Sequence, residues 1–476
     1  MAISAEVRDV EGEIDGRVRA MPLWRCAREP LVRAALDYYR GAGEVLMLGI
    51  AWAAFQGHRE RTRLIEAVPL VENRVRAGVF YVLKWALTLC PEQSTEIFDE
   101  MMVHSAQEIG AHYETLVDSL KLANHGIADI EVDRGARVVT VYEGGDMTGE
   151  DWALVEHQQR TNPFRAHVPL TEDADQLTVA WTAGDYRRTA AWLRDLAAEA
   201  QREQTVMFAP PGVDPVPLFP RPTVVSIPEP PDPKMKAVLD DLTLTPEKLI
   251  GQGFWRYGSW VDTPVILAGT ERLSPSDALI ALGGMAGDDH MLRLAALVDE
   301  PQYVRVSGVR EARMIALCRR ILEPLGWTVT PRFRLTDPPG DVDVYAVRGR
   351  DRMVIQLKST LRPESPWEVY KRNADILDGI EQAHRARAQL GEDVTGVVIT
   401  DGYRGDFASW RVGLERRVAI GTLEDLEAVA SDPGQTFEIL SRRAGLGQES
   451  RSESHERSCD IMGWSLRLVD ASPGVS

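Results

Sequence analysis

The chain has 476 residues, of which 44% are hydrophobic and 26% charged, a composition typical of a globular protein with two to four domains. Its 72 acidic and 54 basic residues give a formal net charge of −18, which at first argues against a nucleic-acid partner. The acidity is uneven, however, because residues 308–432 hold 19 Lys and Arg against 20 Asp and Glu. A partner that carries phosphate is therefore still compatible with this segment.

The sequence contains neither a membrane-span pattern nor a secretory signal. The apolar runs at residues 45–55 and 79–89 are too short to cross a bilayer, and the second contains Lys84. Residues 1–16 are acidic and lack an apolar core. Four cysteines without a CxxC pair argue against a zinc ribbon and a disulfide framework. These features predict a cytoplasmic protein with reduced thiols and no membrane partner.

Residues 1–125 are expected to form a mainly helical domain, because apolar residues recur there at three- and four-residue spacing. Within it, His104, Glu108 and His112 share one helix face, as metal ligands do. The opposite face carries apolar residues, and no second helix offers a matching Glu and His. We therefore interpret the histidine face as a solvated surface rather than a metal site.

A mixed α/β segment is expected over residues 126–207. It contains a predicted hairpin turning at Arg134-Gly135, two strands at 164–170 and 176–183, and an amphipathic helix at 185–203.

Proline then marks the clearest boundary in the chain. Residues 208–234 include ten prolines between Pro210 and Pro233, which favour an extended linker over a helix or a central strand. Residues 235–304 are predicted to be a connecting, partly helical segment. The tail, residues 436–476, is polar and expected to be partly disordered, although its apolar run at 461–469 is able to dock elsewhere.

Residues 305–435 have the clearest order of elements, which indicates a compact α/β sandwich. The predicted elements are a helix that starts at 311 and ends near Glu323-Pro324, a strand at 327–335, a hairpin at 340–358, a helix at 365–390, strands at 395–402 and 418–423, and a helix at 423–430.

Polar residues interrupt the hairpin of this segment. Because strand side chains alternate, Gln356 and Lys358 share one face with Val354. Asp343 starts the preceding strand and would lie opposite the end of the Gln356–Lys358 stretch. A carboxylate and an amide oxygen suit Mg²⁺, and a lysine can orient water or stabilise a pentavalent phosphorus transition state. The alternative interpretation, without a functional site, is an edge strand with solvent-facing polar residues.

The motif "GDVDV" followed by "QLK" resembles the PD-(D/E)xK nuclease superfamily, in particular the Mrr-type restriction endonucleases with Q-x-K. "GVVITDGYRGDFASW" and "VAIGTLEDLEAVA" are similar to later elements of that family. The resemblance implies a restriction-endonuclease-like sandwich in which Asp343 and Gln356 bind the metal and Lys358 serves catalysis. Many members also place a glutamate on the first helix, a position that Glu311 fits.

Three features leave alternatives open. Gln356 is neutral where most of the superfamily has a carboxylate, and Asp341 is an alternative to Asp343 as the metal ligand. Glu311 can equally be a first-turn glutamate favoured by the helix dipole.

The expected function is that of a Mg²⁺-dependent nuclease, with Mn²⁺ as an alternative metal, and DNA is the expected substrate. By resemblance, its setting would be bacterial restriction or anti-phage defence, and a homo-oligomer is compatible with double-strand cutting. The alternative is a nuclease-fold scaffold or nucleic-acid-binding protein without cleavage. The whole chain is thus expected to be multidomain, with a helical N-terminal region, a mixed α/β middle and a C-terminal α/β sandwich.

Overall fold

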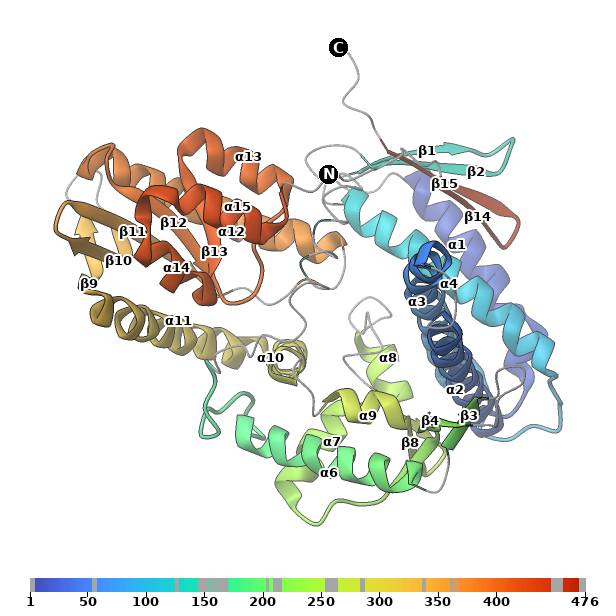
Figure 1. The fold of residues 1–476 in the computed structure, drawn as a ribbon. Helices are drawn as coiled ribbons and strands as arrows, with labels where there is room; N and C mark the ends of the chain where they lie inside the picture. The colour runs from blue at the N-terminus through green and yellow to red at the C-terminus, as the bar shows by residue number, and fades with distance from the viewer. Residues whose placement is uncertain are drawn as a thin grey trace.

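The structure is a computed structural model that describes residues 5–53, 58–124, 128–143, 154, 158, 170–202, 205–208, 216–252, 264–282, 287–335, 340–359, 363, 366–446 and 457–470. It combines helices with mixed sheets, and its N-terminal region is helical as predicted. Figure 1 shows long helices on the right, an α/β sandwich on the left and a smaller mixed part below them. Within the described ranges, no helix has the length and apolar character needed to cross a membrane. All four cysteines are free thiols.

Four long helices form the N-terminal region because their apolar residues recur every three or four positions and so line one face. They are α1 (Ala5–Arg19), α2 (Arg28–Ala53), α3 (His58–Leu89) and α4 (Glu100–Asn124). Helix α3 packs against both α2 and α4. Large side chains such as Phe80, Leu83 and Trp85 fill the core between them. These residues belong to a buried cluster that also includes residues of the docked C-terminal strands and of the C-terminal sandwich.

A four-stranded sheet beside these helices brings distant parts of the chain together (Figure 1). Its order is β1-β2-β15-β14, with β1 (Ala128–Asp133), β2 (Val138–Glu143), β14 (Arg457–Ile461) and β15 (Trp464–Asp470). The hairpin predicted at Arg134-Gly135 is confirmed by the antiparallel pairing of β1 and β2. Strand β15 pairs in parallel with β2, and Ile461, Trp464 and Leu466 are buried. The apolar run of the tail therefore docks on the N-terminal region, because burial of these side chains stabilises the contact.

The middle of the chain includes a hydrophobic cluster that is separate from the one shared by the N-terminal helices and the sandwich. Its elements are α6 (Ala183–Gln201), β3 (Thr205–Phe208), β4 (Val216–Pro220), β5 (Val224–Ile227), α7 (Pro233–Leu242), β6 (Thr243–Leu244), α8 (Pro246–Gln252), β7 (Val265–Ala268), β8 (Glu271–Pro275), α9 (Ser276–Leu282) and α10 (Gly287–Val298). Strands β5, β8, β7 and β6 form one sheet in that order, and β3 pairs with β4.

The Pro-rich segment differs from the extended linker expected at residues 208–234. Strands β4 and β5 lie inside it. Strand β5 is at the edge of its sheet, a position where nearby prolines interrupt few of the hydrogen bonds between strands. Leu193 precedes the segment and Leu239 follows it, yet both belong to the same buried cluster. Buried residues on the two sides of this segment therefore share one hydrophobic cluster.

The strand predicted at residues 176–183 was wrong. The chain there forms a tight turn with an isolated bridge between Gln176 and Thr182. The hydroxyl of Thr178 accepts hydrogen bonds from the backbone of Ala180 and Trp181, which favours a turn over a strand. The following helix was predicted correctly and is α6. The strand predicted at 164–170 lies outside the described residues except for its last position.

A five-stranded mixed sheet forms the centre of the C-terminal sandwich. Its order is β13-β12-β11-β10-β9, antiparallel from β9 to β11 and parallel from β11 to β13. The strands are β9 (Thr328–Leu335), β10 (Gly340–Arg348), β11 (Asp351–Lys358), β12 (Thr395–Thr400) and β13 (Val418–Thr422). The predicted order of strands is confirmed. Strands β11, β12 and β13 are nearly continuously buried, which is typical of strands that are covered on both faces.

The helices of the sandwich are α11 (Glu300–Leu322), α12 (Pro366–Leu390), α13 (Phe407–Arg416), α14 (Leu426–Ser431) and α15 (Thr436–Ala444). Helix α11 contacts β9, β10 and β11 and packs on α14, whereas α12 contacts β11 and β12 and packs on α13. Helix α13 was not predicted. Helix α15 contacts β13, so residues 436–444, which were assigned to the tail, pack on the sandwich.

Candidate functional site

Asp343 lies in β10, one position beyond the pair formed by Val344 and Ile355 of β11. Its side chain is 8% exposed, and its Oδ2 accepts a hydrogen bond of 2.7 Å from the backbone N–H of Leu357. This bond ties the carboxylate to the centre of the Gln356–Lys358 stretch. The backbone pairing therefore brings the two strand ends together, as predicted.

Burial raises the pKa of Asp343 to about 6. The hydrogen bond from Leu357 and the charge of Lys358 act in the opposite direction, and the negative charge of Glu311 adds to the rise. The carboxylate therefore lies within electrostatic range of both predicted charged partners. A cation beside Asp343 would stabilise its ionised form and offset this rise.

Gln356 comes directly after Ile355 in β11, toward the end of the strand, and like Asp343 it is 8% exposed. Its Oε1 is buried and has no hydrogen-bond partner within the described part of the chain. Buried side-chain oxygens are nearly always paired, because an unpaired one costs roughly 1–3 kcal/mol. The amide oxygen therefore has an unfilled requirement for a donor or a cation.

Lys358 is the last residue of β11 and lies against α12. Its Nζ forms an ion pair of 2.7 Å with Asp378, and the Nε2 of Gln382 donates to the same carboxylate oxygen. A Cβ at Gly379 would lie 3.0 Å from the Cε of Lys358, so this glycine leaves room for the lysine chain. Helix α12 thus restricts where the ammonium group lies.

Glu311 is half-buried on α11, in the same helical stripe as the buried Ile315 and Cys318. The preceding residue, Arg310, forms a buried ion pair of 2.5 Å with Asp401, which follows β12. Ser359 Oγ is 3.4 Å from the same carboxylate oxygen. This pair joins α11 to the end of the sheet and so holds Glu311 on the Asp343 side of the helix.

Asp341, the alternative to Asp343, is exposed, and its position in β10 pairs with Arg334 of β9. Burial and the contact with Leu357 distinguish Asp343 from it. Within the described residues, no three His, Cys, Asp or Glu side chains gather as a metal cluster. A cation here would therefore take the carboxylate of Asp343, the amide oxygen of Gln356 and water, with Glu311 as the nearby second acid.

Sequence reasoning missed Asp378, Gly379 and Gln382 as neighbours of Lys358. These residues lie on one side of a helix twenty or more positions further along the chain. Helical spacing groups them with one another, but no local pattern connects them with a strand. The ion pair of Arg310 with Asp401 likewise joins residues that are 91 positions apart in the chain.

The histidine face of α4 is not the solvated surface that was expected. His104 bonds to the hydroxyl of Tyr38 at 2.6 Å, and Arg74 bonds to Glu108 and to His112. The other ring nitrogen of His112 contacts the backbone carbonyl of Asp460 at 2.6 Å. Neighbouring helices and the docked C-terminal strand therefore contact these side chains, which are half-buried rather than fully solvated.

Comparison with known proteins gives no family assignment. No family model matches the chain, and no curated protein matches it. Two solved structures have 12% and 11% sequence identity: protein VC1899 from Vibrio cholerae, and Can2 from Sulfobacillus thermosulfidooxidans in complex with cyclic tetra-adenylate. The first match covers 81% of this chain and 74% of the other with a TM-score of 0.20, and the second covers 71% and 74% with a TM-score of 0.19. Similarity at this level does not establish a shared fold.

Proposed function

We propose that residues 305–435 form a restriction-endonuclease-like domain that hydrolyses phosphodiester bonds of nucleic acid with the help of Mg²⁺, and that DNA is its substrate. The observation that carries this proposal is the buried Asp343 beside an unpartnered amide oxygen of Gln356, one residue from Lys358. These groups follow the D-x₁₂-Q-x-K spacing of the Mrr-type nucleases that the sequence resembles. The setting that this resemblance suggests is bacterial defence against foreign DNA.

The residues at this site fit a hard cation. A buried acid with a raised pKa and an orphaned oxygen both gain from a positive charge, and both are oxygen donors, which Mg²⁺ prefers. Asp343 and Gln356 would hold the ion, and Glu311 would supply further negative charge. When bound, Mg²⁺ lowers the pKa of a coordinated water and offsets negative charge on the phosphate. Mn²⁺ accepts the same ligands.

The remaining work belongs to the protein side chains. Lys358 would place its ammonium group beside the scissile phosphate and stabilise the charge that develops on its oxygens. Asp378 and Gln382 fix the direction of that ammonium group through the observed contacts. The hydrogen bond from Leu357 holds one oxygen of Asp343 in the plane of the sheet edge and leaves the other carboxylate oxygen for binding.

Cleavage of supercoiled plasmid and single-stranded DNA, with and without Mg²⁺, tests this proposal. We expect Mg²⁺-dependent nicking by the parent protein and none by Asp343→Asn. Asp341→Asn is the matched control, because it removes an exposed carboxylate two positions away on the same strand. Equal cleavage by all three proteins would place the activity elsewhere.

A binding protein without cleavage is the second candidate. Two observations favour it: the neutral Gln356 contributes no charge, and Lys358 already has Asp378 as an ion-pair partner. A gel-shift experiment separates the two candidates. Retarded DNA that is never cut, at any concentration of Mg²⁺ or Mn²⁺, would support binding alone.

A further inference from the structure

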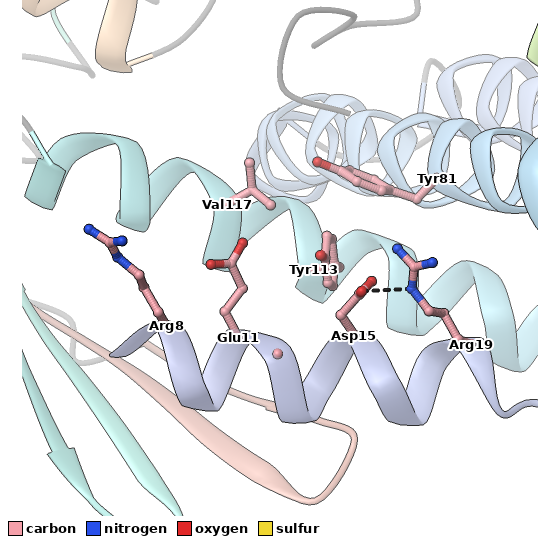
Figure 2. A pocket seen from close by; sticks show the side chains of 8 residues that line it. Arg8, Glu11, Asp15, Arg19, Tyr81, Tyr113 and Val117 are labelled. Carbon is pink, nitrogen blue, oxygen red and sulfur yellow. Dashed lines mark hydrogen bonds and ion pairs between the residues drawn. The ribbon is translucent and has the colours of Figure 1, made fainter. Parts of the chain in front are cut away.

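Helices α1, α3 and α4 enclose a pocket of about 250 Å³ in the N-terminal region, far from the nuclease-like sheet. Figure 2 shows Glu11 and Asp15 projecting from α1 toward α4, with Tyr81 of α3 and Tyr113 of α4 on the opposite wall. Arg8 and Arg19 line its two ends. The pocket therefore combines two acids, two tyrosines and two arginines in the volume of a small molecule.

Two tyrosine hydroxyls in this pocket lack partners. Tyr81 is 3% exposed and Tyr113 is 8% exposed, and neither hydroxyl forms a hydrogen bond with any described residue. Neither oxygen is among the buried polar atoms without a partner, so both hydroxyls are open to the pocket rather than sealed in the core. A polar ligand in the pocket can therefore hydrogen-bond to both of them.

The charges of the pocket divide into a paired and an unpaired set. Arg19 Nε donates to Asp15 at 2.7 Å, so these two charges compensate each other. Glu11 is half-buried and has no hydrogen-bond or ion-pair partner within the described residues. Arg8 is exposed at the rim. The unsatisfied charge nearest to the tyrosines is therefore a carboxylate.

The pKa shifts of Tyr113 and Glu11 agree with this division of the charges. Burial raises the pKa of Tyr113, and the charges of Asp15 and Glu11 raise it further against the opposing charge of Arg19. Burial also raises the pKa of Glu11, and Asp15 adds to the rise against Arg8. The two carboxylates thus act on Tyr113 more strongly than Arg19 does, so a cation beside Tyr113 would be favoured, although the lining as a whole has two acids and two arginines.

The tyrosine wall is rigid and aromatic. The rings of Tyr81 and Tyr113 meet edge to face with centroids 5.3 Å apart, and both lie against Trp85 at 5.6 and 5.5 Å. Such a cluster is preformed, so binding a ligand would not require it to reorganise. Aromatic faces attract ammonium and guanidinium groups as well as alkyl chains.

From these features we infer that the pocket binds a small organic cation, with a primary ammonium or guanidinium group on a short alkyl chain. The cationic group would donate to Glu11 and to the hydroxyl oxygens of Tyr81 and Tyr113. Its alkyl chain would pack on the tyrosine rings and on Val117, which also lines the pocket. This inference concerns a different part of the molecule and does not depend on the proposed nuclease activity.

Isothermal titration of the full chain with putrescine, agmatine and spermidine tests the inference. We expect at least one of these amines to bind, and Glu11→Gln to weaken it at least about tenfold, the scale of one charge-assisted hydrogen bond. Tyr81→Phe keeps the ring and removes only the hydroxyl, so we expect a weakening of roughly three- to tenfold. Glu6→Gln is the matched control, because it removes an exposed carboxylate from α1 outside the pocket and should leave binding unchanged.

Thermal unfolding without ligand separates loss of binding from loss of structure. Because Glu11 is half-buried and unpaired, Glu11→Gln should unfold at the same temperature as the parent or at a higher one. Absence of binding by the parent with all three amines at millimolar concentration would overturn the inference. Amine binding that survives both pocket substitutions, or a preference for acetate, glutamate or phosphate over the amines, would overturn it equally.

Discussion

Two acids with raised pKa values, one in each half of the molecule, show what separates a structural carboxylate from a candidate ligand. Burial raises the pKa of the half-buried Glu114 in α4 to about 7 and that of Asp343 in β10 to about 6. The charge of Asp118 adds to the rise at Glu114, and the charges of Lys84 and Lys121 oppose it. Lys84 is fully buried against the rings of Phe80 and Tyr81. The helical region therefore places two cations near its own acid.

Asp343 also has a second acid nearby, Glu311, but its surroundings differ in the buried amide oxygen of Gln356, which has no partner among the described residues. Within that part of the chain, Lys358 is the cation that lowers its pKa, and Lys358 forms its ion pair with Asp378. Negative and acceptor groups thus exceed donors at the sheet edge, which is the imbalance expected where an external cation binds. Each of the following predictions tests this contrast.

The largest expected effect is on cleavage. Asp343→Asn should reduce Mg²⁺-dependent DNA cleavage below detection, because it removes the only buried carboxylate among the three oxygen ligands that we propose. Glu114→Gln removes the comparable acid of the helical region and should leave cleavage unchanged. Plasmid nicking rates of the two variants provide the measurement. A similar loss in both would mean that the two acids do not differ in function.

Lys358→Arg is the next test. It retains the positive charge but replaces a compact ammonium group with a planar guanidinium, which fits poorly beside Gly379. We expect at least roughly a hundredfold loss of cleavage, the scale of losing one charge stabiliser. Lys371→Arg is the control, because it makes the same exchange at an exposed position of α12. Unchanged cleavage rates in Lys358→Arg would remove this lysine from the proposed site.

The sequence was sufficient for the parts of this site that depend on local geometry. Alternation along β11 places Gln356 and Lys358 on one face, and the hairpin length brings Asp343 to their end. The element order of the sandwich followed from the same periodicity, whereas the restriction-endonuclease-like fold and the roles of these residues remain predictions. The domain boundaries assigned from composition remain predictions as well.

Features that depend on distant contacts were not predicted. Nothing near Lys358 in the chain indicates Asp378, and nothing near β2 indicates its pairing with β15. The Pro-rich segment shows the same limit, because proline excludes a central strand but permits an edge strand such as β5. The pocket between α1, α3 and α4 also arises only when three helices meet, so single-helix patterns do not contain it.

Stability should depend on pH through Asp343. Its pKa of about 6 in the folded protein lies above the value of about 3.9 in an unfolded chain, so the folded state holds the extra proton between these values. The contribution to stability is complete below about pH 4 and is lost as the pH rises through 6, on the order of 2–3 kcal/mol. Relative to Asp343→Asn, the unfolding midpoint of the parent in urea should therefore fall between pH 4 and pH 7.

Mg²⁺ distinguishes this acid from Glu114. Glu114 has a raised pKa too, so the parent should lose stability relative to Glu114→Gln as the pH rises toward 7 and beyond. Addition of Mg²⁺ at pH 7 should raise the stability of the parent relative to Asp343→Asn and leave its stability relative to Glu114→Gln unchanged. If Mg²⁺ affects neither comparison, Asp343 is a structural acid like Glu114.

The smallest expected effect concerns the neutral ligand. Gln356→Glu keeps the length of the side chain and adds a charge next to Asp343, which binds a cation more strongly but repels the existing carboxylate without one. We expect the Mg²⁺ concentration for half-maximal cleavage to fall by several-fold, roughly 1 kcal/mol, and to rise in Gln356→Ala. Gln435→Glu is the control, because it makes the same exchange at an exposed position between α14 and α15, outside the proposed site. Titration of Mg²⁺ against the cleavage rate measures all four proteins. Identical midpoints would show that the buried amide oxygen does not contact the metal, and would shift the weight of evidence to the binding protein without cleavage.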